Sequence, residues 1–124
     1  MNLQDQAQEF RHHFGVENSR DNRDMQLTLI KEECKEFVEA HDQMFDTPEG
    51  ETEALKELAD LVYVAFQYAE NMEWDLIEAY RRVHQSNMSK LGEDMKPIRR
   101  EDGKILKGPN YAPPNLDDLC HLIC

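Results

Sequence analysis

The chain has 124 residues, a formal net charge of −12 and a pI near 4.7. That length predicts a single domain spanning residues 1–124, and the acidic balance argues against nucleic acid or an anionic membrane as a partner. No apolar run approaches the roughly 20 residues of a membrane span, the first six residues lack the features of a signal peptide, and the three cysteines form no disulfide framework. We therefore expect a cytoplasmic protein with free thiols.

Four amphipathic segments follow one another along the chain. Hydrophobic residues recur at helical spacing in residues 2–14, from about 21 or 24 to 45, in 51–71 and in 75–91. The apolar stripe of the second segment includes Cys34, which predicts that this thiol lies in the core. The full stripe consists of Leu27, Ile30, Cys34, Phe37, Val38 and His41. The third segment has a broad apolar arc, so we expect it to be buried on more than one side, as in a bundle or an oligomer.

The pattern changes after Gly92. Residues 92–124 are rich in Gly, Pro and basic side chains, which predicts loops with a short hairpin. The expected fold class is all-α: a four-helix bundle-like core over about residues 2–91, with an irregular basic C-terminal tail. Cys120, His121 and Cys124 offer too few ligands for a zinc site. Four residues suggest instead a small apolar anchor that docks the tail: Leu116, Leu119, Leu122 and Ile123.

Two groups of acidic residues stand in consecutive predicted helices. The first comprises Glu32, Glu33 and Glu36, and the second comprises Glu57 and Asp60. Side chains three or four positions apart share a helix face, so antiparallel packing of the two helices would bring the acids together as oxygen ligands of Mg²⁺ or Mn²⁺. Glu33 lies nearest the apolar stripe, where an unpaired carboxylate is costly unless a cation compensates it.

The charge is unevenly distributed along the chain. Residues 28–80 carry 15 acidic and 3 basic side chains, whereas residues 81–107 carry 8 basic and 4 acidic ones. An acidic middle followed by a basic strip suits a metal-bound polyanion, with carboxylates on the metal and Lys or Arg on the phosphates. The alternative is that both regions are ordinary solvated helix faces that attract each other.

The motif Glu-Glu-x-x-Glu on one helix, followed by Glu-x-x-Asp on the next, resembles the metal motif of the all-α nucleoside triphosphate pyrophosphohydrolases. That superfamily contains MazG, the dimeric dUTPases and phosphoribosyl-ATP pyrophosphohydrolase. Residues 10–15, 29–33, 84–90 and 103–111 are similar to further segments of MazG-like proteins, many of them phage-encoded. The resemblance covers about residues 8–115.

The resemblance implies hydrolysis of a nucleoside triphosphate between the α and β phosphates, which releases a monophosphate and pyrophosphate. It implies Mg²⁺ or Mn²⁺, two or more ions per site, and it assigns Glu33 as the general base that orients the attacking water. Four residues match its metal-ligand positions: Glu32, Glu36, Glu57 and Asp60. The candidates for binding phosphate or nucleotide are Asn87, Lys90, Lys104, Lys107 and Tyr111.

The sequence leaves alternatives open for the substrate, the assembly and the class of function. The fourth-helix signature favours GTP or dGTP as the substrate, and the alternative substrates are dUTP, dCTP and phosphoribosyl-ATP. We expect a homodimer or homotetramer with the nucleotide site near a subunit interface, in the cytoplasm of a host cell if the protein is phage-encoded. A function of another class would be a non-catalytic acidic helical interaction module.

Overall fold

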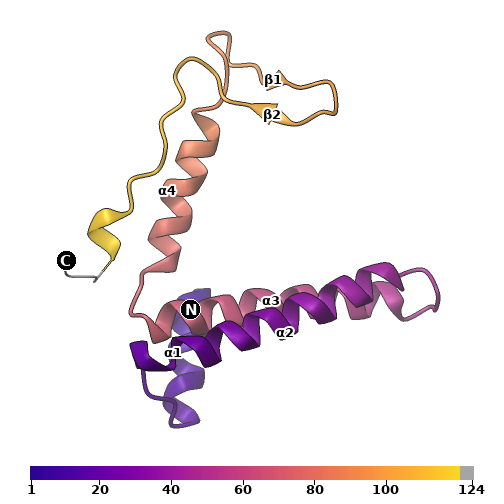
Figure 1. The fold of residues 1–124 in the computed structure, drawn as a ribbon, viewed down its shortest axis with the longest axis vertical. Helices are drawn as coiled ribbons and strands as arrows, with labels where there is room; N and C mark the ends of the chain where they lie inside the picture. Colours follow the sequence, from indigo (N-terminus) through magenta and orange to yellow (C-terminus); the bar gives the residue numbers. More distant parts are fainter. Residues whose placement is uncertain (121–124) are drawn as a thin grey trace. The chain divides into compact units, whose positions relative to one another are not determined.

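The structure is a computed structural model that describes residues 1–120, and the chain divides into two compact units, Met1–Asp75 and Leu76–Cys124. The first unit contains α1 (Leu3–His13), a 3₁₀ turn η1 (Arg20–Asn22), α2 (Arg23–Asp42) and α3 (Gly50–Asn71) (Figure 1). The second contains α4 (Leu76–Met88), the strands β1 (Ile98–Arg99) and β2 (Ile105–Leu106), and a 3₁₀ turn η2 (Asp117–Leu119). The predicted all-α class is confirmed, whereas the single-domain boundary stays a prediction. Among the described residues, no helix is both long and apolar enough to cross a membrane.

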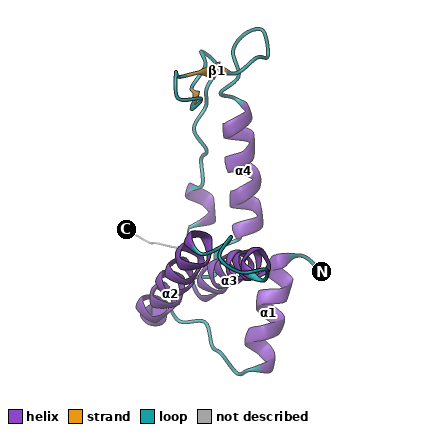
Figure 2. Cartoon of the chain, turned by 90° about the vertical axis from the view of Figure 1, so that its right-hand side faces the viewer, coloured by secondary structure: helices purple, strands orange, loops and turns teal. Residues whose placement is uncertain are grey.

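An antiparallel hairpin of α2 and α3 forms most of the first unit, and α1 packs against α3 (Figure 2). A capping box begins α1, in which Asn2 Oδ1 accepts from the Asp5 amide at 2.8 Å and Asp5 Oδ2 accepts from the Asn2 amide at 2.9 Å. The turn between α2 and α3 is so close that a Cβ on Gly50 would lie 2.1 Å from the carbonyl oxygen of Met44. Glycine at this position therefore allows the hairpin to close.

The face that α2 turns inward differs from the predicted stripe. Gln26 is buried and Glu33 is half-buried, whereas Cys34 is exposed. The core position predicted for Cys34 is therefore wrong in this chain. Ile30 and Phe37 are half-buried as the stripe implied. The stripe residues Leu27, Val38 and His41 are exposed like Cys34, because packing against α3 selects a face rotated toward Gln26 and Glu33.

On α3 the acidic face packs against α2, and much of the apolar arc stays exposed. Glu57 and Asp60 are half-buried, whereas the side chains of Leu55, Leu58 and Val62 are 68%, 42% and 40% exposed. These three side chains and part of α1 line an open apolar groove of about 420 Å³. The groove is lined by Leu3, Gln6, Ala7, Leu55, Leu58, Ala59, Val62, Tyr63 and Phe66.

A buried polar network joins α1, the connector after it and the C-terminal end of α3. The Arg11 guanidinium donates to Asn18 Oδ1 (2.8 Å), to Gln67 Oε1 (3.1 Å) and to Asn71 Oδ1 (3.1 Å), and it also reaches the carbonyl oxygen of Glu17 (3.1 Å). Asn71 is 1% exposed, and its amide group donates to the Ser19 carbonyl oxygen at 2.8 Å. Burial lowers the pKa of Arg11, and nearby Glu70 opposes that effect. The planar fork of Arg11 satisfies acceptors that would otherwise be buried without donors.

The second unit is an α4 helix with the tail fastened along it. The two strands pair antiparallel, Ile98 with Leu106 and Arg99 with Ile105, which confirms the predicted hairpin. Farther along, the Ala112 amide donates to Ser89 Oγ at 3.0 Å. Leu116 and Leu119 are half-buried at the end of this stretch. The other two residues of the predicted anchor, together with His121 and Cys124, lie outside the described residues.

We predict that Arg11→Lys destabilises the protein by roughly 1–3 kcal/mol, because an ammonium cannot reproduce the fork and leaves buried acceptors without donors. Urea unfolding followed by circular dichroism measures the change. Arg23→Lys is the matched control, since exposed Arg23 makes one bond to the Arg20 carbonyl oxygen, and its effect should stay within about 0.5 kcal/mol. Equal stability of the two variants would contradict this account of the network.

Candidate metal centre

Carboxylates from α2 and α3 converge on one point of the hairpin. Glu33 and Glu36 come from α2 and Glu57 from α3, and one oxygen of each lies within 4.8 Å of the others. The spacing i, i+3 on α2 places its two acids on adjacent positions of one face. Asp60, one turn after Glu57, is close enough to act electrostatically on Glu33. The predicted convergence of the two acidic groups is therefore present in the fold.

Glu33 occupies the least favourable place in this cluster for a negative charge. Burial raises the pKa of Glu33, and the carboxylates of Glu36, Asp60 and Glu57 raise it further. Within residues 1–120, Oε2 of Glu33 and Oε2 of Glu57 are both buried and accept no hydrogen bond. A buried acceptor without a donor normally costs about 1–3 kcal/mol, and more when it is charged. The cluster therefore lacks a partner for at least two of its oxygens.

One cation of the chain relieves part of this repulsion. The Lys56 ammonium lies 2.7 Å from Asp60 Oδ2 and 3.4 Å from Glu57 Oε1. The hydrogen bond to Asp60 is the main cause that raises the pKa of Lys56, so its side chain stays charged at neutral pH. Among the described residues, Lys56 is the cation that forms ion pairs with the clustered acids, and its partners are Glu57 and Asp60.

The donor set fits a hard divalent cation. Mg²⁺ and Mn²⁺ take oxygen ligands, and here all the candidate donors are carboxylate oxygens from two rigid helices. The unpartnered buried oxygens of Glu33 and Glu57 are the specific observation behind this fit, because a bound cation would satisfy both.

Glu32 stands apart from the residues that converge. It is exposed on α2 and is not a member of the cluster, whereas its neighbour Glu33 is. The geometry therefore brings together Glu33, Glu36, Glu57 and Asp60, and it leaves the predicted ligand Glu32 on the outer face. Sequence reasoning also missed the buried role of Arg11, whose acceptors Gln67 and Asn71 lie far along the chain.

The predicted phosphate and nucleotide ligands belong to the second unit. A Cβ on Gly108 would lie 2.6 Å from the carbonyl oxygens of Lys90 and Leu91, so this glycine lets the chain pass against the end of α4. The Lys107 ammonium sits 4.7 Å from the centre of the Tyr111 ring, a cation–π contact. Asn87 and Lys104 are exposed, on α4 and at the hairpin respectively. Of the predicted ligands, Lys107 and Tyr111 are thus in contact with each other.

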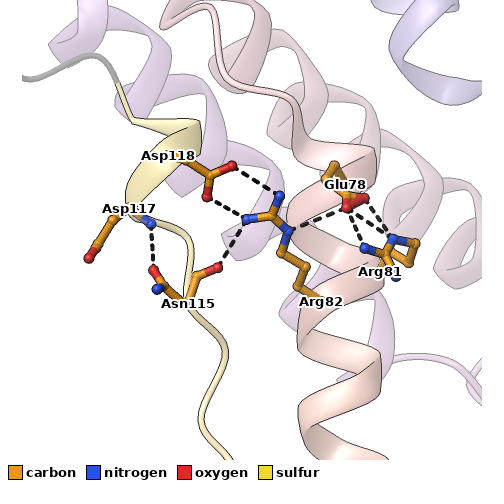
Figure 3. A network of polar contacts seen from close by, with 6 residues as sticks. All are labelled: Glu78, Arg81, Arg82, Asn115, Asp117 and Asp118. Atoms are coloured by element: carbon orange, nitrogen blue, oxygen red, sulfur yellow. Dashed lines mark hydrogen bonds and ion pairs between the residues drawn. The ribbon is translucent and has the colours of Figure 1, made fainter.

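The two arginines Arg81 and Arg82 of α4 form ion pairs with carboxylates of their own unit (Figure 3). Arg82 binds both oxygens of Asp118, at 2.6 and 3.1 Å, and also the carbonyl oxygen of Asn115. Arg81 binds Glu78, and this hydrogen bond, aided by Arg82, lowers the pKa of Glu78 to about 2. These bonds fasten the tail to α4. They also leave the lysines near Gly108 as the more available cations for a phosphate.

An all-α fold that brings acids of two consecutive helices together is the arrangement expected of the MazG-like all-α NTP pyrophosphohydrolase superfamily. Within that superfamily, the sequence model of the phosphoribosyl-ATP pyrophosphohydrolase (PRA-PH) family matches residues 3–87. The chain therefore belongs to this family, and it is an enzyme of the pyrophosphohydrolase class, which acts on acid anhydrides. Members of the family depend on divalent metals. No curated protein sequence matches the chain at a significant level.

The raised pKa of Glu33 predicts how stability depends on pH. A folded-state pKa above the unfolded value of about 4.3 means that the metal-free fold holds its proton more tightly, so this contribution is present at low pH and is lost as pH rises through the folded pKa. In EDTA, the melting temperature of the wild type relative to Glu33→Gln should therefore rise as the pH falls from 7.5 toward the unfolded pKa. Differential scanning fluorimetry measures both proteins.

Divalent cations should reverse this trend, because they bind the deprotonated carboxylates. At about 100 times Kd, Mg²⁺ or Mn²⁺ should raise the melting temperature by about 5–10 °C at pH 7.5, and by less at pH 5.5. Glu51→Gln, an exposed acid in the first turn of α3, is the control and should respond like the wild type. No response of the wild type to either cation would rule out the metal centre.

Proposed function

We propose that this enzyme hydrolyses a nucleoside triphosphate between the α and β phosphates, in a reaction that needs Mg²⁺ or Mn²⁺ and releases a monophosphate and pyrophosphate. One carboxylate oxygen each of Glu33, Glu36 and Glu57 converges within 4.8 Å, and this convergence is the observation that carries the proposal. Among residues 1–120, the buried Oε2 atoms of Glu33 and Glu57 also have no hydrogen-bond partner. Membership of the PRA-PH family supports the anhydride chemistry.

The proposed ligands are Glu33, Glu36, Glu57 and Asp60. This set places Glu33 on the metal in preference to Glu32, because Glu33 lies in the cluster and Glu32 on the exposed face. When bound, the cation would neutralise phosphate charge and lower the pKa of a coordinated water. The resemblance gives Glu33 a different role, that of the general base that orients the attacking water. A carboxylate that is bound to a cation is a weaker base, so the two roles are alternatives for Glu33.

The second unit supplies the proposed contacts to the substrate. Lys90, in the turn that follows α4, and Lys107 would pair with phosphate oxygens, with Asn87 of α4 and Lys104 of the hairpin as further donors. Tyr111 offers a ring for stacking, although it already packs under Lys107. The free thiols of Cys34 and Cys120 suit the reducing cytoplasm that we propose as the compartment.

The reaction is tested directly by product analysis. We expect GTP or dGTP, with Mg²⁺ or Mn²⁺, to give the monophosphate and pyrophosphate, and the panel includes dUTP, dCTP and phosphoribosyl-ATP as the alternative substrates. Anion-exchange chromatography resolves the products. Release of diphosphate and orthophosphate would contradict cleavage at the α–β bond, and inactivity across the panel would contradict the proposed substrate class.

Variants of the acids test the ligand assignment. Glu33→Gln and Glu57→Gln should each lower kcat/KM at least about 100-fold, because each removes a charged ligand, whereas Glu32→Gln should lower it much less. Glu51→Gln is again the control with full activity. An equal loss in Glu32→Gln and Glu33→Gln would restore Glu32 to the ligand set.

We also propose that the chain assembles as a homodimer or homotetramer, with the nucleotide site near a subunit interface. The exposed Leu55, Leu58 and Val62 support this assembly, because contiguous apolar side chains on a helix face are typical of an interface. The groove beside α1 offers the concave part of such a surface.

The assembly is tested by placing a charge on this face. Leu58→Glu should shift the protein toward the monomer in light scattering coupled to size-exclusion chromatography, because a buried unpaired carboxylate is costly. Met95→Glu, on a side chain that is 73% exposed and lies outside this face, is the matched control and should keep the assembly. A monomeric wild type at micromolar concentration would contradict the proposal.

A further inference from the structure

Lys56 stands at the acidic cluster without being one of its candidate ligands. Its ammonium lies 2.7 Å from Asp60 Oδ2 and 3.4 Å from Glu57 Oε1, and both partners belong to α3. Of the ion pairs in residues 1–120, these two are the ones that involve the clustered acids. The Lys56 ammonium thus contacts two of the carboxylates that a divalent cation would need as ligands.

The exposures of the three side chains show which partner can leave. The Lys56 side chain is 65% exposed, against 18% for Glu57 and 36% for Asp60. The carboxylates are therefore held in the interface of α2 and α3, whereas the lysine reaches them from the solvent side. A long exposed side chain can swing into water, which hydrates the ammonium strongly.

We infer that Lys56 is an intramolecular counter-ion of the metal centre: its ammonium neutralises Glu57 and Asp60 in the metal-free enzyme, and an incoming divalent cation displaces it. The inference rests on the proposed function, since it requires that the cluster binds a metal. It gives Lys56 a regulatory role at the site, because occupancy by the ammonium sets how tightly the metal binds.

Competition follows from the geometry of the two contacts. The ammonium lies 2.7 Å from Asp60 Oδ2 and 3.4 Å from Glu57 Oε1, so a divalent cation bound by other oxygens of these two carboxylates would lie within a few ångströms of a like charge. A cation that stays beside the metal would repel it. The exchange replaces one cation by another, so it needs no proton to leave Lys56.

The same contact explains how the metal-free hairpin tolerates its acids. Glu57 and Asp60 would repel Glu33 and Glu36 across the interface of α2 and α3, and the ammonium reduces that repulsion. Removing the charge of Lys56 should therefore have opposite effects on two properties: lower stability without metal and higher affinity for metal.

Isothermal titration calorimetry with MnCl₂ and with MgCl₂ tests the inference on the full chain. Lys56→Gln should bind metal about fivefold more tightly than the wild type, the size expected for removing one unit charge a few ångströms away. Lys56→Arg keeps the charge and should bind like the wild type. Lys35→Gln is the matched control, because Lys35 pairs with Glu39 at 3.9 Å on α2, and its affinity should change less than twofold.

Melting temperatures provide a second readout that does not depend on activity. Lys56→Gln should melt below the wild type in EDTA, and the difference should close in saturating Mn²⁺. Equal affinities of the wild type and Lys56→Gln, with clear binding by both, would overturn the role of Lys56 and leave the metal centre in place. Absence of binding in every variant would overturn the metal centre itself, and the inference with it.

Discussion

The repulsion among carboxylates in the interface of α2 and α3 is the constraint on which the rest of this structure depends. One oxygen each of Glu33, Glu36 and Glu57 lies within 4.8 Å of the others. Within the described part of the chain, the buried Oε2 atoms of Glu33 and Glu57 have no hydrogen-bond partner. An interface built this way does not hold the hairpin together by itself. Compensation comes from Lys56 at the cluster, and a divalent cation would supply the remainder. The site is therefore formed at the expense of stability, as is common where a fold positions like charges for chemistry.

Stability of the first unit comes instead from the other end of the hairpin. Arg11, Gln67 and Asn71 form a buried network that joins α1 and the connector to the last turns of α3. The buried apolar side chains include Ala7, Ala54 and Ala69, whereas large apolar side chains of α3 such as Leu55 and Leu58 are exposed. The polar network joins α1 to α3 through hydrogen bonds. The first unit thus has a hydrogen-bonded polar network at one end of α3 and a carboxylate cluster toward the other.

The two units also differ in charge. Residues 1–75 carry 19 acidic and 6 basic side chains, whereas residues 76–124 carry 7 and 8. In the second unit, Arg81 and Arg82 are satisfied within the unit and hold the tail on α4. The acidic excess thus belongs to the unit that contains the carboxylate cluster, whereas the second unit carries a slight excess of basic side chains.

The sequence by itself determined the four helices, the hairpin in the tail and the pairing of acidic groups on consecutive helices, because helical spacing fixes the angles between side chains of one helix. It did not determine how each helix is rotated about its own axis against its neighbour. That rotation, which depends on the packing of both helices together, placed Glu33 inside and left Glu32 and Cys34 exposed. Arg11 had no local signal either, since its acceptors on α3 lie 56 and 60 positions away. Only the tertiary structure brings such residues together. The roles of Lys56 and of the two unpartnered oxygens can likewise be inferred only from their positions in the folded chain.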